Sequence, residues 1–333
     1  MSGAPWWRPR PRLPSARPTA PASARPIDPF SGSRSGRYED DVVVVVRGER
    51  LPRQPALGRR WTAVTRHFVL GREGPRLLLV HALPPVAVDN EVAALLAEEL
   101  FAPGWAYGAE TFERLMTGLV LTCHDDPMTA WEGFYRATLD RLDGAGPGAT
   151  GFAPVYVRAA DLVRAAPTRT LLDLGTCFGF FPLLLATGRV PGRPAARPRL
   201  SARAADISCG AATLLRQMSA RLGVPLPVLV CDAARVPLPD GDADTVTVLH
   251  LLEHVDAGHG ERIIGEAARL ARRRVVVAVP LETEPDAAFG HVRTVSLDDL
   301  ARSGRALARS GPWRSRVEEH HGGWLVLDRP RVR

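Results

Sequence analysis

The feature that most restricts the fold of this chain is an alternation of short apolar runs and helical patterns that begins at Arg169. Six apolar runs are candidate strands: Thr170–Leu174, Arg203–Asp206, Pro227–Cys231, Thr245–His250, Arg274–Pro280 and Gly323–Leu327. Helical patterns separate the first five. Parallel strands need such crossover helices. We therefore expect residues 151–333 to form an α/β domain with a doubly wound, mostly parallel, seven-stranded Rossmann-like sheet.

The residues before this domain divide into two parts. Residues 1–40 are rich in Pro, Arg, Ser and Ala and hold few large apolar groups, so we expect a disordered tail. Residues 41–150 predict a smaller α+β region that begins with β-rich runs over 42–46, 61–70 and 76–83, interpreted as an antiparallel meander. Helical periods follow within 89–142. We interpret this region as a candidate lid over the substrate side of the larger domain.

Composition restricts the class of partner. All 43 basic residues of the 333-residue chain are arginine, and the net charge is +7. The first 40 residues supply +4 of that charge, so the remainder lacks the basic footprint of a nucleic-acid-binding protein. No apolar run approaches the roughly 20 residues of a membrane span. The cysteines lack metal-ligand spacing, and we expect a cytoplasmic protein with reduced thiols. The sequence does not determine the oligomeric state.

The first candidate strand runs into a glycine-containing loop, which is a candidate ligand-binding turn. The strand ends in Asp173 and Leu174, and Gly175, Thr176, Cys177, Phe178 and Gly179 follow. Glycines let a backbone turn sharply and approach a ligand closely. A tight turn with no ligand is the alternative. Cys177 lies within this loop and is not a glycine, so we expect it to keep a negative φ.

Acidic residues follow the next two candidate strands. Asp206 and Ile207 come after the second strand, where a carboxylate can accept hydrogen bonds from both ribose hydroxyls. Asp206 lies 33 residues after Asp173, and we interpret the excess, 188–200, as a surface insertion. Asp232 and Ala233 follow the third strand, where a carboxylate can accept from the exocyclic amine of adenine. A helix cap is the alternative role for Asp206.

Together with the run 244–255 after the third strand, these elements resemble class I S-adenosylmethionine-dependent methyltransferases. The G-x-G-x-x-G pattern of NAD-dependent dehydrogenases is not matched. The resemblance implies S-adenosylmethionine as the cofactor. It also implies these cofactor-binding residues: Asp173, Gly175, Thr176 and Gly179 for the amino-acid part, Asp206 and Ile207 for ribose, Asp232 and Ala233 for adenine, and His250 beside the same pocket.

Four side chains on the predicted acceptor side are candidate catalytic groups. They are His250, Glu253, His254 and His291. Methyl transfer to a hydroxyl benefits from a general base. The alternative is that these residues only shape the loop. The same four could also form a mixed nitrogen and oxygen metal site. We predict no metal, because His250 stands where metal-binding relatives carry their first acidic ligand.

The chain from Trp61 onward resembles a narrower family, the mycofactocin oligosaccharide methyltransferases of actinobacteria. The matching stretches are 98–105, 126–136, 151–156, 231–241 and 320–327. The resemblance implies O-methylation of a sugar hydroxyl on a glycosylated small molecule, the oligosaccharide of the redox cofactor mycofactocin. His320, His321 and Trp324 are candidates for binding a sugar ring, with a plain hairpin as the alternative. A quinone, polyketide or lipid methyltransferase and a non-catalytic S-adenosylmethionine-binding module are the competing hypotheses.

Overall fold

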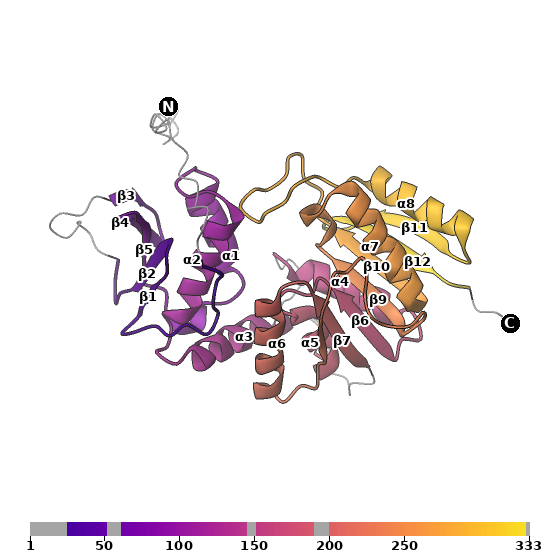
Figure 1. Cartoon of the computed structure of the whole chain (residues 1–333), viewed down its shortest axis with the longest axis horizontal. Helices are drawn as coiled ribbons and strands as arrows, with labels where there is room; N and C mark the ends of the chain where they lie inside the picture. Colours follow the sequence, from indigo (N-terminus) through magenta and orange to yellow (C-terminus); the bar gives the residue numbers. More distant parts are fainter. Residues whose placement is uncertain (1–24, 52–60, 145–150, 190–199, 331–333) are drawn as a thin grey trace, which may run out of the picture.

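Two sheets organise the chain (Figure 1). The computed structural model describes residues 25–51, 61–144, 151–189 and 200–330. A five-stranded sheet with its helices forms the N-terminal body, and a seven-stranded sheet covered by helices forms the C-terminal body. None of the helices in these ranges is long and apolar enough to span a membrane.

The N-terminal sheet has the order β1-β2-β5-β4-β3. Its strands are β1 (Arg37–Glu39), β2 (Val43–Arg47), β3 (Trp61–Val64), β4 (Phe68–Glu73) and β5 (Arg76–His81). Strands β3, β4 and β5 form an antiparallel meander as predicted, but β2 pairs with β5 in parallel, so the meander does not extend to the first run. Side chains of β2 are buried on both faces, which suits an inner strand.

The predicted tail ends earlier than residue 40. Residues 1–24 lie outside the described residues, but 25–40 pack on the N-terminal body. The indole of the buried Trp131 donates to the carbonyl of Pro29 over 2.6 Å, and the buried Arg114 donates to the carbonyl of Arg25. The prediction of disorder is wrong for these residues because two buried donors of the helices need the acceptors that this segment supplies.

Helices cover the face of this sheet that is turned toward the C-terminal body (Figure 1). A 3-10 turn, η1 (Pro85–Ala87), precedes α1 (Val92–Leu96), which continues into a π-helical turn, η2 (Ala97–Phe101). Next come α2 (Ala109–Leu121) and α3 (Pro127–Asp143), the latter capped by Asp126. Helix α2 lies against β2, and a Cβ added at Gly118 would overlap the side chain of Val45.

The C-terminal sheet has the strand order β11-β12-β10-β9-β6-β7-β8. The strands are β6 (Thr170–Leu174), β7 (Ser201–Asp206), β8 (Val228–Val230), β9 (Ala243–Leu249), β10 (Ala271–Val279), β11 (Arg314–Glu319) and β12 (Gly323–Asp328). Pairings among the first five are parallel, whereas β12 is antiparallel to both neighbours. The predicted fold class and all six candidate strands are confirmed, and β11 is the strand that the apolar pattern did not indicate.

Helices lie on both faces of this sheet. Helices α4 (Ala153–Arg164), α5 (Phe180–Thr187) and α6 (Cys209–Arg221) share one core with Leu171 and Ala204. On the other face, α7 (Ala257–Leu270) and α8 (Leu297–Ser310) pack with Leu172 and Leu174. The chain proceeds in one direction from β6 to β8 and in the other from β9 to β11, so the topological switch lies between β6 and β9. Ligands of such sheets bind outside the carboxyl ends of the strands at this point.

An aromatic cluster joins the two bodies. The rings of Trp131, Phe134 and Tyr135 on α3 lie 5.9, 5.3 and 6.3 Å from the ring of Phe178, which belongs to the glycine loop after β6. Phe180 at the start of α5 completes the cluster. The N-terminal body therefore shares a continuous core with the α4–α6 face of the C-terminal sheet.

Candidate functional site

The loop after β6 is shaped by two left-handed glycines. Gly175 has φ +70° and Gly179, which begins α5, has φ +71°. The amides of Gly175 and Thr176 both donate to the carbonyl of Ala205 on β7, over 2.9 and 3.1 Å. A Cβ at Gly175 would come within 2.7 Å of Leu251, so this position accepts only glycine without a shift. The contact with Leu251 also brings the loop beside the segment that follows β9.

Cys177 does not keep the negative φ that the sequence led us to expect. Its φ is +51°, a left-handed conformation that costs a non-glycine residue about 1 kcal/mol or more. The expectation is wrong because the turn requires this geometry, and it gains a hydrogen bond from the Cys177 amide to Asp206 Oδ2 at 2.8 Å. The thiol side chain is exposed.

Asp173 anchors the loop from inside the protein. It is buried, and its two oxygens accept hydrogen bonds from the hydroxyls of Thr247 (2.6 Å) and Thr176 (2.7 Å). Burial raises the pKa of Asp173 to about 6, although both hydroxyl contacts act to lower it. Because Thr247 lies on β9 and Thr176 in the loop, Asp173 fixes the loop across the switch point.

Asp206 lies at the end of β7 and faces the same loop. Besides the Cys177 amide, its carboxylate accepts from the Ser208 amide at 2.9 Å. The cap of α6 is Ser208, which accepts from the Ala211 amide, so the alternative of a capping role for Asp206 is not what the structure shows. Ile207 is 72% exposed, an unusual state for a large apolar side chain at a strand end. An exposed apolar group beside a carboxylate suits a nucleoside, which has an apolar base face and a ribose with hydroxyl donors.

Asp232 follows β8 and has a partner that sequence reasoning missed. Its Oδ1 accepts from the Ala234 amide at 2.8 Å and lies 2.9 Å from His259 Nε2 on α7. The Ala234 amide, and His259 with it, lowers the pKa of Asp232. Ala233 is half-buried beside it. Nothing in the sequence marks His259, since it stands in the first turn of a helix 27 residues away.

His250 terminates β9 in a left-handed conformation, with φ +53°. Its amide donates to the carbonyl of Ala278 on β10, and its Nδ1 lies 3.4 Å from Glu253 Oε1. The ring of Phe152 lies 5.2 Å away, edge to face. His250 Nε2 is buried and has no hydrogen-bond partner within the described part of the chain. One nitrogen thus faces a carboxylate and the other is free.

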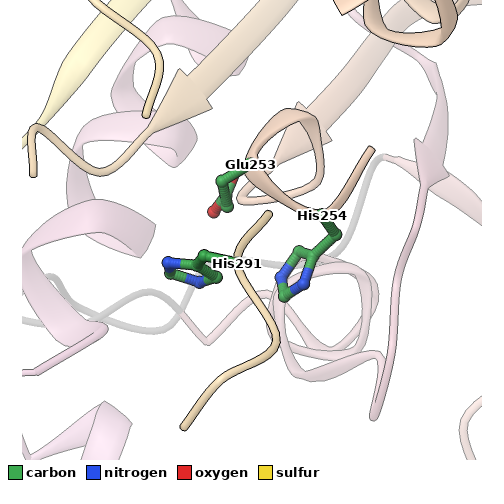
Figure 2. A group of neighbouring side chains, drawn as sticks. All are labelled: Glu253, His254 and His291. Carbon is green, nitrogen blue, oxygen red and sulfur yellow. The ribbon is translucent and has the colours of Figure 1, made fainter. Parts of the chain in front are cut away.

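Three of the four predicted catalytic side chains form a tight group. Ligand atoms of Glu253, His254 and His291 all lie within 4.8 Å of one another (Figure 2). Glu253 and His254 belong to the turn η3 (Leu252–His254), whereas His291 comes from the segment between β10 and α8. The rings of His254 and His291 meet edge to face, with centroids 4.8 Å apart. Desolvation lowers the pKa of His254, and the neighbouring His291 adds to that effect.

The 281–296 segment is fixed to the η3 turn by backbone contacts. The Val292 amide donates to the carbonyl of Glu253 at 2.9 Å, and the Arg293 guanidinium donates to the carbonyls of Leu252 and Val255. Glu282 holds His291, with both carboxylate oxygens 2.9 Å from Nδ1. Glu282 was not predicted, although its place just after a strand at the carboxyl edge was a usable signal.

The His320–Trp324 segment does not form the predicted sugar platform. It is the turn between β11 and β12, in which the His320 amide donates to the carbonyl of Gly322. Trp324 is 1% exposed, and its indole donates to the His320 carbonyl, so its ring has no face for a ligand. The expectation is wrong because Trp324 points into the sheet core, and the hairpin alternative holds.

The N-terminal body borders the predicted acceptor side. The segment between β10 and α8 extends toward α1 and α2 (Figure 1). Phe289 on this segment lies 5.1 Å from the ring of Phe112 on α2. A cavity of about 420 Å³ lies at this junction, lined by residues within 97–108 on one side and by 285–288 on the other. Both bodies therefore contribute to the surroundings of His291.

Comparison with known proteins finds a family match within the C-terminal body. Residues 172–279 match the family model described as a methyltransferase domain. No curated protein matches the sequence significantly. Similar solved structures include a candidate O-methyltransferase from Nostoc punctiforme (18% identity, 60% of this chain and 60% of that one, TM-score 0.41).

A second is a magnesium protoporphyrin IX methyltransferase from Synechocystis with bound S-adenosylmethionine (18% identity, 58% of this chain and 90% of that one, TM-score 0.40). A third is an S-adenosylmethionine-dependent methyltransferase from Aquifex aeolicus (18% identity, 57% of this chain and 92% of that one, TM-score 0.38). The chain thus spans 60% of the Nostoc protein and most of the other two. Likenesses this distant carry no information on the acceptor. The family match identifies a methyltransferase domain within the chain.

Proposed function

We propose that this chain, which contains a methyltransferase domain, is an S-adenosylmethionine-dependent O-methyltransferase. Its acceptor would be a sugar hydroxyl of a glycosylated small molecule, namely the oligosaccharide of mycofactocin. The observation that carries the proposal is the group of His250, Glu253, His254 and His291 next to the glycine loop. Such groups suit an acceptor that must lose a proton, as a hydroxyl must.

The residues around the loop fit the cofactor. The ends of β6, β7 and β8 carry a left-handed glycine at Gly175, a carboxylate at Asp206, an exposed apolar side chain at Ile207 and a second carboxylate at Asp232. We propose that Asp206 accepts from ribose hydroxyls with the lone pairs left beside its two backbone contacts. Asp232 and Ala233 would border the adenine, and Gly175, Thr176 and Gly179 the amino-acid part. Asp173 would act indirectly, by holding the loop.

When bound, S-adenosylmethionine supplies a methyl group on a positively charged sulfur. The chain itself must then orient the acceptor and remove its proton. We propose His250 as the base, because its Nε2 has no partner in the described structure while its Nδ1 faces Glu253. The carboxylate stabilises the protonated imidazole and fixes its orientation. Holding the reacting groups in line supplies much of the remaining acceleration.

Two exposed aromatic rings support a sugar as the acceptor. Phe152 lies 5.2 Å from the ring of His250, and Phe289 lies 6.0 Å from that of His291. Each is more than one third exposed. Aromatic faces with a few convergent polar groups are typical of ligand sites. The sequence resemblance to mycofactocin oligosaccharide methyltransferases favours a glycan among such ligands.

Exposed aliphatic groups beside the site favour a second candidate acceptor. Leu281 is 41% and Val292 is 63% exposed on the segment that carries His291. An apolar acceptor such as a quinone, polyketide or lipid would cover them. In either case we propose that the N-terminal body acts as a lid on the acceptor side, because α2 contacts Phe289.

The test is methyl transfer by the purified full chain from labelled S-adenosylmethionine. Acceptors are a mycofactocin-type oligosaccharide and, separately, quinone and lipid fractions. We expect label on the glycan, and a 14-Da loss from the glycan mass ladder when the gene is deleted. Label on an apolar fraction instead would support the second candidate. Calorimetric binding of the cofactor without transfer to any fraction would support a non-catalytic module.

His250→Asn and His320→Asn form a matched pair for the proposed base. Both replace one histidine by a residue of similar shape that does not titrate near neutrality. We expect His250→Asn to lower kcat by about 100-fold or more, which is the usual scale for a lost general base, and to leave cofactor binding intact. His320→Asn should keep full activity, since His320 lies in the β11–β12 turn. Equal activity of the two variants would contradict the assignment.

A further inference from the structure

We propose that Glu253, His254 and His291 bind a divalent transition-metal ion. The sequence prediction of no metal depended on His250 occupying a ligand position. The structure forms a group that does not need His250, because the three other side chains bring one ligand atom each to within 4.8 Å of one another (Figure 2).

The state of Glu253 is the strongest argument. Glu253 is 1% exposed, and neither of its carboxylate oxygens has a hydrogen-bond partner among the described residues. A buried carboxylate without partners is strongly unfavourable, and buried charges are paired or coordinate metals. His250 Nδ1 lies 3.4 Å from Oε1 and pairs with it only when the imidazole is protonated, and neither oxygen accepts a hydrogen bond in the part of the chain that the structure describes. A cation between Glu253, His254 and His291 would satisfy this carboxylate.

His291 is held as a metal-binding histidine usually is. Its Nδ1 faces both oxygens of Glu282 at 2.9 Å, which leaves Nε2 as the free nitrogen. A carboxylate on the far nitrogen fixes ring orientation and raises the basicity of the ligating nitrogen. His254 lies at the exposed end of the group, so the site is open to solvent on that side.

The donor set indicates which ions fit. Two imidazoles and one carboxylate suit Mn, Fe, Co, Ni or Zn, whereas magnesium and calcium prefer oxygen alone. Three protein ligands leave at least one coordination position open, which is the arrangement of catalytic rather than structural sites. The group of ligands itself lies at the carboxyl edge of the sheet, next to His250 and the exposed Phe289.

A role for the ion rests on the proposed function. The open position would take the oxygen of the acceptor hydroxyl and lower its pKa. The hydroxyl proton passes to His250 Nε2, an oxygen lone pair forms the new bond to the methyl carbon, and the electron pair of the broken carbon–sulfur bond stays on sulfur. The products are the methyl ether of the acceptor, S-adenosylhomocysteine and protonated His250, so the positive charge of the sulfonium ends on the imidazole.

The binding test is a titration of the metal-stripped, tag-free full chain with Co²⁺, followed by visible absorption. We expect saturation at one equivalent, and at least about 10-fold weaker binding in Glu253→Gln and His254→Asn. The double variant His320→Asn/His321→Asn is the control, since these two histidines form an adjacent pair on an exposed turn and are not part of the group. It should bind as the wild type does.

Binding that is absent in the wild type, or equal in all four proteins, overturns the site. His254→Asn guards against misfolding as an explanation, because His254 is at the surface and its replacement leaves the core intact. Glu253→Gln adds a second readout: loss of the buried charge should raise the melting temperature of the metal-free protein and abolish the rise that Co²⁺ produces in the wild type. An unchanged Co²⁺-induced rise would refute the role of Glu253.

Chelator treatment separates this inference from the proposed function. Loss of glycan methylation on stripping, with S-adenosylmethionine still bound and activity restored by Mn²⁺ or Co²⁺, supports both. Full methylation by the stripped protein overturns the role of the ion and leaves the O-methyltransferase proposal standing. One bound Co²⁺ per chain with no transfer to any glycan supports the site and overturns the proposed function.

Discussion

Asp173 should make the folded protein less stable as pH rises, and Asp173→Asn should remove that dependence. The carboxyl group is buried with only two threonine hydroxyls as partners, and its folded-state pKa is raised to about 6. The reference value is 3.8. Between these two values the folded state holds the proton more tightly than the unfolded state, so the free energy of unfolding falls with increasing pH.

The size of the effect follows from the difference in pKa. A shift of roughly two units at about 1.4 kcal/mol each corresponds to about 3 kcal/mol when both states are ionised. Near pH 4 most of this cost is absent, because the folded state keeps Asp173 protonated. The stability of Asp173→Asn relative to the wild type should therefore increase by about 2 to 3 kcal/mol between about pH 4 and pH 7.5.

Urea denaturation of both proteins without cofactor, at a series of pH values, measures this difference. The change with pH is the informative quantity, since a constant offset also includes altered hydrogen bonding to Thr176 and Thr247. Asp244→Asn is the control of opposite sign. Burial acts to raise the pKa of Asp244, but the Arg169 amide and the Arg272 side chain lower it to about 2.

Asp244 therefore contributes stability that is fully present above pH 4 and is lost as the pH falls toward 2. Its variant should show no further change relative to the wild type between about pH 5 and pH 7.5. A difference between Asp173→Asn and the wild type that stays constant over that range would refute the buried-charge argument. A difference that decreases with pH would mean that Asp173 has a partner cation in the folded state.

Three further changes test the local geometry. Gly179→Ala should lower the free energy of unfolding by about 2 kcal/mol in urea denaturation, because φ is +71° and the new Cβ would lie 2.5 Å from Leu215; a loss below 0.5 kcal/mol would contradict this. Cys177→Gly should change stability by less than about 1 kcal/mol, since relief of the left-handed strain is offset by unfolded-state entropy, and a larger loss would reveal a packing role for the thiol. His259→Ala should raise the pKa of Asp232 and weaken S-adenosylmethionine binding in calorimetry, and unaltered affinity would remove Asp232 from the adenine site.

The C-terminal sheet could be read from the sequence because its inner strands are buried on both faces. Such strands are continuous apolar runs, and β6 has the bounds that the sequence predicts. Strand β11 could not be predicted, since its residues Arg-Ser-Arg-Val-Glu-Glu look like a solvated segment and are stabilised by pairing at the sheet edge. The parallel pairing of β2 and β5 could not be predicted either, because strand order depends on long-range contacts that a local sequence pattern does not contain.

The site was predictable where position along a strand fixes it. The carboxyl ends of β6, β7, β8 and β9 carry Asp173, Asp206, Asp232 and His250 near the switch point, as the alternation of strands and helices implied. Partners joined by long-range contacts were not visible. No spacing rule links His259 to Asp232. The left-handed φ of Cys177 was also hidden, since the residue type argued against it and only the Asp206 contact explains it.

Phe178 makes the two bodies inseparable. Although it belongs to the glycine loop after β6, its ring is held by three aromatic side chains of α3 from the N-terminal body. A chain cut near residue 150 would leave these rings in water and leave the loop without its support. We therefore expect the C-terminal body to lose stability, and its glycine loop to lose its fixed position, when the N-terminal body is removed.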